Sequence, residues 1–171
     1  MSPPFEDTLR LLDTWYNEPS IGNDRPKLIS KLALLELCGW IEVTFDELIY
    51  KVDKLTINDT DWVSENLIKK TNGFTYNLHL RPMIVKLIGE VLARRVEQLM
   101  EEKYAGELDR MKSILGSLWD KRCSFAHANM AVNIIAQTKF DAPSWSSNQH
   151  RVLKKLFEKY ELSLNETLSD L

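Results

Sequence analysis

A stripe of apolar residues between positions 34 and 52 constrains the fold more than any other feature of the sequence. Its members recur at alternating intervals of four and three residues, which is the spacing of one face of an α-helix. They are Leu34, Cys38, Ile41, Phe45, Leu48 and Val52. Asp24 and Pro26 form a helix start, because proline is tolerated in a first turn. We therefore expect one long helix over residues 26–52.

Similar periodicity predicts helices along most of the remaining chain. The expected helices cover residues 6–16, 59–72, 81–104, 108–120 and 126–135, with a last helix beginning at Ser146. Gly73 and Gly106 are expected to end or break helices. Ser146 and Gln149 have the spacing of a capping box, so residues 138–147 are expected to form a loop.

Two segments carry more particular expectations. Phe74, Tyr76, Leu78 and Leu80 alternate with polar residues, and without a second strand this pattern predicts an extended connector packed on the bundle. In the helix over 81–104, the expected apolar face consists of Val85, Ile88, Leu92, Val96 and Leu99. The sequence as a whole predicts an all-α, single-domain bundle of five to seven helices over residues 1–171.

Composition excludes several classes of protein. Hydrophobic residues make up 44% of the chain, enough for a packed core. The most apolar stretch is too short to span a membrane, and no signal sequence precedes it, so we expect a cytoplasmic protein. Cys38 and Cys123 belong to no metal-binding pattern and are expected to be reduced thiols, with no zinc site. The six glycines form no phosphate-binding loop, and no cofactor is expected.

Only three histidines are present for acid–base chemistry, and one of them has a distinctive flanking sequence. His79 falls in the expected connector and has no assigned role. His127 follows Arg122 by five positions, between small residues that leave room for a ligand. The alternative reading is structural: Arg122 pairs with a carboxylate and His127 caps a helix end.

Glu42 is the carboxylate most suited to pair with Arg122. It lies on the long helix among apolar neighbours, so it is expected to be partly buried and to need a partner. A bidentate pair would orient the guanidinium. The alternative is a glutamate at the edge of the apolar stripe that reaches solvent.

These residues resemble the HEPN superfamily, small α-helical domains of which many are ribonucleases. The segment from Arg122 to His127, Arg-Cys-Ser-Phe-Ala-His, fits the family's Arg-x4–6-His signature. The long early helix with its acidic residue at Glu42 is similar to the corresponding helix of the RiboL-PSP-HEPN branch. A polar residue usually follows the arginine in active members, whereas this chain has Cys123.

The resemblance implies metal-independent cleavage of RNA, in which the ribose 2′-hydroxyl attacks the adjacent phosphate. DNA lacks this hydroxyl and is not an expected substrate. His127 would transfer protons and Arg122 would neutralise charge on the phosphate. The family also implies a two-fold dimer, and an antitoxin or another protein regulator is a possible partner in defence, stress response or growth arrest.

Several further residues are candidates for supporting roles. Ser124 and Asn129 would hydrogen-bond the phosphate or orient the imidazole, and Asp120 precedes the motif. Candidate substrate contacts are Lys121, His150 and Lys154. For His150, a solvated helix face is the competing expectation.

Two other functions remain open from the sequence. Cys123 and the net charge of −3 favour a HEPN-like module that has lost catalysis and serves dimerisation or partner binding. The third reading is an unrelated helical adaptor in which the Arg-x4-His spacing is a coincidence.

Overall fold

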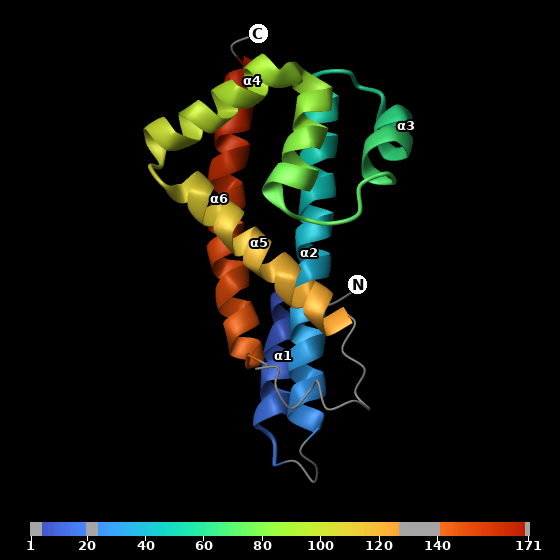
Figure 1. Cartoon of the computed structure of the whole chain (residues 1–171), viewed down its shortest axis with the longest axis vertical. Coiled ribbons are helices and arrows are strands. Elements are labelled where there is room, and N and C mark those ends of the chain that lie inside the picture. The colour runs from blue at the N-terminus through green and yellow to red at the C-terminus, as the bar shows by residue number, and fades with distance from the viewer. Residues whose placement is uncertain (1–4, 20–23, 127–140, 170–171) are drawn as a thin grey trace.

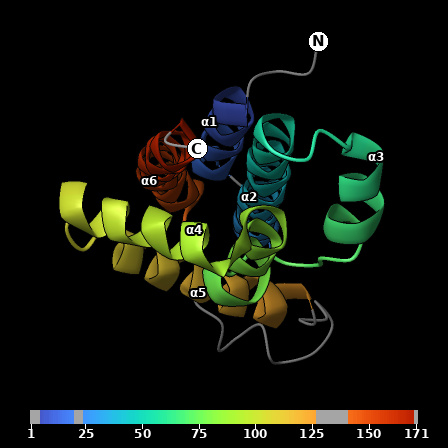
Figure 2. The same cartoon turned by 90° about the horizontal axis from the view of Figure 1, so that it is seen from above.

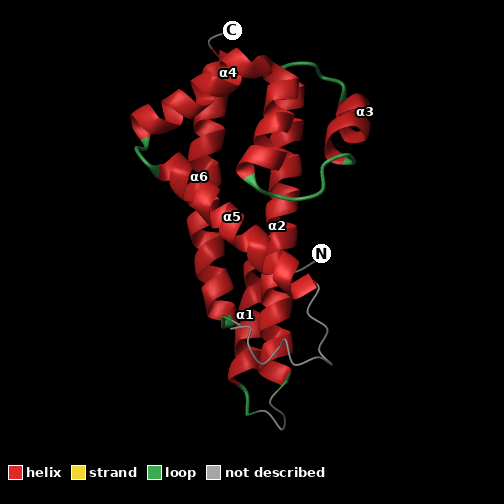
Figure 3. Cartoon of the chain, viewed as in Figure 1, coloured by secondary structure: helices red, strands yellow, loops and turns green. Residues whose placement is uncertain are grey.

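The computed structural model describes residues 5–19, 24–126 and 141–169. Within these residues the chain forms helices and loops but no strand (Figure 3). The α-helices are α1 (Phe5–Asn17), α2 (Arg25–Leu55), α3 (Thr60–Val63), α4 (Arg81–Lys103), α5 (Glu107–Ala126) and α6 (Pro143–Ser169), and two π-helical turns are η1 (Ser64–Ile68) and η2 (Tyr76–Leu80). The predicted all-α bundle is confirmed.

The two longest helices, α2 and α6, form the axis of the bundle (Figure 1). At 1.5 Å per residue, α2 is about 46 Å long. Helix α1 packs against both of them, and α5 crosses both diagonally. Seen from above in Figure 2, α4 and α5 lie on one side of this axis, while α3 stands beside α2. This arrangement brings the end of α5 against the middle of α2.

The predicted core of the bundle is largely correct. The predicted apolar face of α2, from Leu34 to Val52, is buried, and α5 and α6 contribute further buried residues at helical spacing. The largest fully buried side chains include Phe45, Phe74, Tyr76, Ile84, Met100 and Tyr160. A smaller cluster, formed by Leu9, Leu12, Ile29 and Ala33, joins α1 to the start of α2.

Helix α4 bends at Gly89, and the bend changes its buried face. Gly89 has φ 80° and ψ 163°, a conformation open to glycine but not to residues with a Cβ. The predicted face assumed one straight helix, whereas Val85 and Ile88 are only partly buried. Before the bend, the buried residues are instead Met83, Ile84 and Leu87.

The segment predicted to be an extended connector is helical over its last five residues, so that prediction is wrong. The Leu80 amide donates to the Thr75 carbonyl at 3.3 Å, which closes the π-helical turn η2. Tyr76 and Leu80 therefore point into the core, while Leu78 is 74% exposed. The alternating pattern was misleading because two of its members, four residues apart, share one face of a turn.

The predicted start of the helix at residue 59 or 60 is confirmed, although that α-helix is short. The Asp59 side chain accepts a hydrogen bond from the Trp62 amide at 3.0 Å, as an N-cap does. Asp53, fully buried at the end of α2, accepts from the Asp59 amide at 2.9 Å and from the Thr60 hydroxyl at 3.1 Å. One carboxylate thus fixes the turn between α2 and α3.

The last helix begins at Pro143, earlier than predicted. Pro143 occupies the first turn, where its missing amide hydrogen costs nothing. Ser146 lies within the helix and is buried, so it is not the N-cap and the predicted capping box is wrong. The helix predicted over 126–135 falls almost entirely outside the described residues.

Candidate functional site

Arg122 lies in the last turns of α5, where three neighbours position its guanidinium. One guanidinium nitrogen is 3.2 Å from Glu42 Oε1 on α2. The Arg122 Cζ atom lies 5.3 Å from the ring centre of Trp119 and 6.0 Å from that of Phe74, which are cation–π distances. The side chains of Arg122 and Glu42 remain 34% and 37% exposed. The pair predicted from the sequence forms, through one contact rather than a bidentate one.

The Arg122–Glu42 pair borders a recess of about 220 Å³ between α2 and the segment before η2. Glu42 and Asp46 contribute carboxylates to its wall, and Arg122 is its only cation among the described residues. Burial, and secondly the charge of Glu42, raise the pKa of Asp46. The recess is therefore acidic apart from Arg122, and an anionic ligand would have to approach from the guanidinium side.

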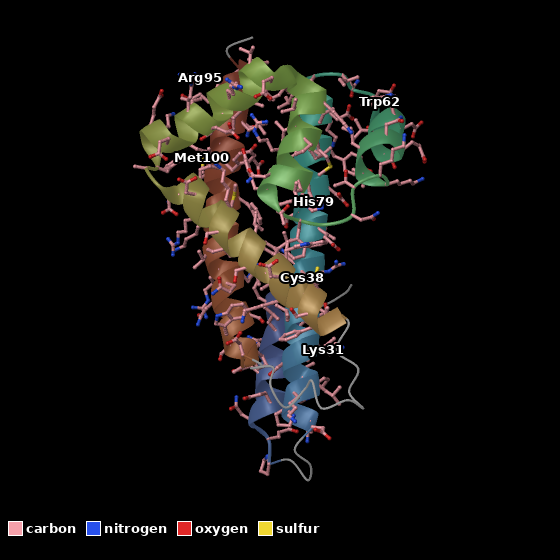
Figure 4. All side chains as sticks on the ribbon, in the orientation of Figure 1. Lys31, Cys38, Trp62, His79, Arg95 and Met100 are labelled. Carbon is pink, nitrogen blue, oxygen red and sulfur yellow. The ribbon has the colours of Figure 1, made fainter. Side chains whose placement is uncertain are left out.

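Cys38 lies one helical turn before Glu42 on α2, and Figure 4 labels it where α5 crosses that helix. Its side chain is buried, and burial raises the pKa of the thiol to about 12. Arg122 opposes this shift, while Glu42 and Cys123 add to it. Cys38 is consequently protonated at neutral pH and is a packing residue rather than a nucleophile.

His79 contacts Trp119, one of the side chains that position Arg122. The sequence alone assigned His79 no role. Its ring centre is 5.3 Å from that of Trp119, the same indole that lies beside the guanidinium. The Thr75 amide donates to His79 Nδ1 at 3.0 Å, so a neutral imidazole carries its proton on Nε2. The turn η2 (Figure 4) brings His79 here, and only the four-residue spacing of Thr75 and His79 hints at it in the sequence.

The other predicted residues that the structure describes are not gathered around Arg122. Asp120 is exposed, and the Ser124 hydroxyl donates to the Asp120 carbonyl at 2.9 Å, along its own helix. Lys121 pairs with Asp141 and lies 4.6 Å from the ring centre of Trp145. His127 and Asn129 lie outside the described residues.

The expectation that His150 lies on a solvated helix face is wrong. Its side chain is 4% exposed because α1 and α2 pack over it with aromatic rings. The ring centres of Phe5 and Trp40 lie 4.8 Å and 4.4 Å from that of His150. Burial lowers the pKa of His150, with Glu6 acting against that shift.

Lys154 belongs to the same cluster and not to the site of Arg122. Its ammonium donates to Glu6 Oε1 at 3.1 Å, and His150 Nε2 is 3.8 Å from that oxygen. Trp40 and Glu42 are two residues apart on α2, which places them on nearly opposite sides of the helix. The structure therefore separates His150 and Lys154 from the Arg122–Glu42 pair.

The fold defines an all-α helical bundle, with a positioned arginine on one helix face. None of the described helices is long and apolar enough to cross a bilayer. Within the described ranges, no three histidine, cysteine or acidic side chains converge as metal ligands. No protein-family model, curated protein or solved structure matches this chain significantly.

Proposed function

We propose that this protein is a metal-independent endoribonuclease of the HEPN type, with Arg122 and His127 as its catalytic residues. The observation that carries the proposal is the setting of Arg122. Its guanidinium contacts Glu42, Trp119 and Phe74, while the Arg122 side chain keeps about a third of its surface exposed. A fixed, accessible guanidinium is well suited to neutralise charge that develops on a phosphate.

The proposed reaction needs two proton transfers. A base removes the proton of the ribose 2′-hydroxyl, and the resulting oxygen attacks the adjacent phosphorus. The bond from phosphorus to the 5′-oxygen breaks, and an acid protonates that oxygen. The products are a 2′,3′-cyclic phosphate and a 5′-hydroxyl, so DNA is not a substrate. An imidazole with a pKa near 6.5 performs either transfer at neutral pH.

One histidine does not serve as acid and base in the same step, so we further propose a two-fold homodimer. A second copy would supply the second His127 across a shared groove. Reduced thiols fit a cytoplasmic location, where a protein regulator or antitoxin would restrain the enzyme. Ser124 and Asn129 remain proposed phosphate contacts.

The nuclease proposal is tested with purified protein and mixed RNA in EDTA. We expect wild type to leave cyclic-phosphate ends, and Arg122→Ala and His127→Ala to lose about 10²-fold or more in rate. Arg94→Ala is the matched control, because Arg94 is an exposed, ion-paired arginine on α4. Its rate should equal that of wild type. Equal cleavage by all four proteins would mean a contaminating nuclease and would contradict the proposal.

A second candidate function is a HEPN-like module that dimerises without catalysis. An exposed apolar stripe on α2 favours it, formed by Leu28, Leu32, Leu35 and Val43, and we call it the α2 stripe. Leu35 and Glu42 are seven residues apart and share one side of the helix, so the stripe continues to the Arg122–Glu42 pair. Dimerisation without RNA cleavage would favour this function over the nuclease.

A further inference from the structure

A second recess, of about 430 Å³, lies between the start of α5 and the middle of α6. We call it the α5–α6 recess, and its polar lining comes from Glu107, Arg110, Asn148, Arg151, Lys155 and Lys159. Four of these side chains are cationic and one is a carboxylate. The recess is therefore strongly positive on a chain whose formal net charge is −3.

Two of the four cations have no carboxylate partner among the described residues. All the other described arginines take part in ion pairs. Arg151 and Lys155 form no ion pair with any described residue. Both side chains are exposed. By contrast, Lys159 donates to Glu107 Oε1 at 3.0 Å, and Arg110 lies 3.5 Å from Oε2. Arg151 and Lys155 are thus free to bind an anion.

The regular spacing of the cations is suited to binding an extended polyanion. Arg151, Lys155 and Lys159 follow one another at intervals of four residues, about 6 Å along one side of α6. Like charges at this spacing repel and destabilise an isolated helix. A chain of phosphates laid along the helix would relieve that repulsion and release counterions.

We propose that the α5–α6 recess binds the phosphodiester backbone of single-stranded RNA. The choice of RNA as the polyanion rests on the proposed function. Helix α5 carries Arg110 near its start and Arg122 near its end, about 18 Å apart along the helix. A strand held in the recess therefore lies within a few nucleotides of the proposed cleavage site, and the recess adds substrate affinity without touching the scissile phosphate.

The test measures binding of a fluorescein-labelled single-stranded RNA that carries 2′-O-methyl riboses and resists cleavage. We expect the double variant Arg151→Gln/Lys155→Gln to bind at least tenfold more weakly in fluorescence anisotropy. The slope of log affinity against log salt should fall in magnitude by roughly 1–2. The matched control is Lys54→Gln/Lys86→Gln, which removes the same charge from exposed lysines on α2 and α4 that have no ion pair among the described residues, and it should bind like wild type.

Failure of the recess and failure of the nuclease are distinguishable. If wild type binds RNA through the recess but cuts none, this proposal stands and the nuclease proposal falls. If RNA is cut while the double variant and wild type bind it equally, the recess is not an RNA site. The recess proposal would also be overturned if wild type bound no RNA. The same holds if wild type bound anionic lipid vesicles and RNA did not displace them. Arg122→Ala should bind the uncleavable RNA close to normally.

Discussion

Gly73 shows how one residue allows the candidate site to assemble. It is buried, with φ 138°, where the chain turns toward η2. A Cβ atom at this position would lie 2.4 Å from His79 Nε2 and 2.9 Å from Trp119 Cη2. Because Trp119 also lies beside the Arg122 guanidinium, the close approach at Gly73 sets the packing behind the proposed catalytic arginine.

We therefore predict that Gly73→Ala lowers the free energy of unfolding by about 2–3 kcal/mol, because it adds backbone strain and a steric clash. Urea denaturation followed by circular dichroism measures the change. Gly116→Ala is the control: Gly116 lies within α5, and apart from its chain neighbours and the adjoining helix backbone no described atom lies within 4 Å of an added Cβ. That substitution should stabilise the protein by up to about 1 kcal/mol. Equal effects of the two substitutions would contradict the packing described for Gly73.

At the scale of elements, His150 joins three helices. It belongs to α6, makes edge-to-face contacts with Phe5 of α1 and Trp40 of α2, and faces the carboxylate of Glu6. Lys154 and Arg151 on its own helix add positive charge nearby, which further lowers the pKa of His150. The docking of α1 therefore includes a buried imidazole that is uncharged at neutral pH.

This burial predicts a pH dependence of stability. Since the pKa of His150 is lower in the folded than in the unfolded state, the unfolded state binds the proton first as the pH falls. The free energy of unfolding should be highest above about pH 6.5 and decrease toward pH 5.

Urea denaturation at several pH values checks this dependence, with His150→Phe as the comparison. The variant keeps an aromatic ring between Phe5 and Trp40 but does not titrate, so its stability should change less between pH 7.5 and 5. Glu6→Gln should steepen the dependence, because it removes the carboxylate that favours the protonated ring. Identical pH profiles for wild type and His150→Phe would rule out the proposed cause.

Across the whole molecule, two surfaces differ from the rest, one in exposed apolar side chains and the other in positive charge. The α2 stripe exposes leucines beside the Arg122–Glu42 pair, and the α5–α6 recess concentrates unpaired cations. Most other described arginines and lysines are in ion pairs with carboxylates of the same surface. We expect the proposed dimer to form through the α2 stripe, because this exposed apolar surface lies beside the Arg122–Glu42 pair.

We accordingly predict a dimer in solution that Leu32→Lys converts to a monomer. Leu32 is 43% exposed, so the substitution should cost the monomer less than about 1 kcal/mol while placing a charge in the apolar interface. Analytical ultracentrifugation over a range of concentrations measures the mass. Leu162→Lys is the control, because Leu162 is equally apolar and 58% exposed but lies on α6. A monomeric wild type would exclude the two-fold arrangement.

Part of the candidate site was predictable from sequence, and part was not. The pairing of Arg122 with Glu42 was predicted because a glutamate among apolar neighbours needs a cation. The contact of Arg122 with Phe74, and the position of His79 beside Trp119, could not be predicted. They depend on the π-helical turn η2, whose residues alternate like a strand when they are read locally.

The positions of α1, α2, α4 and α5 follow from the local sequence, because apolar residues at intervals of three and four residues share one helix face and are buried together. The local sequence also determined the starts of α2 and α3 and the break at Gly106, where local backbone chemistry acts. The bend at Gly89, the burial of His150 and the gathering of cations between α5 and α6 arise instead from tertiary packing. Each of these depends on which helices meet across the bundle, and the packing of distant segments overrides local pattern and polarity.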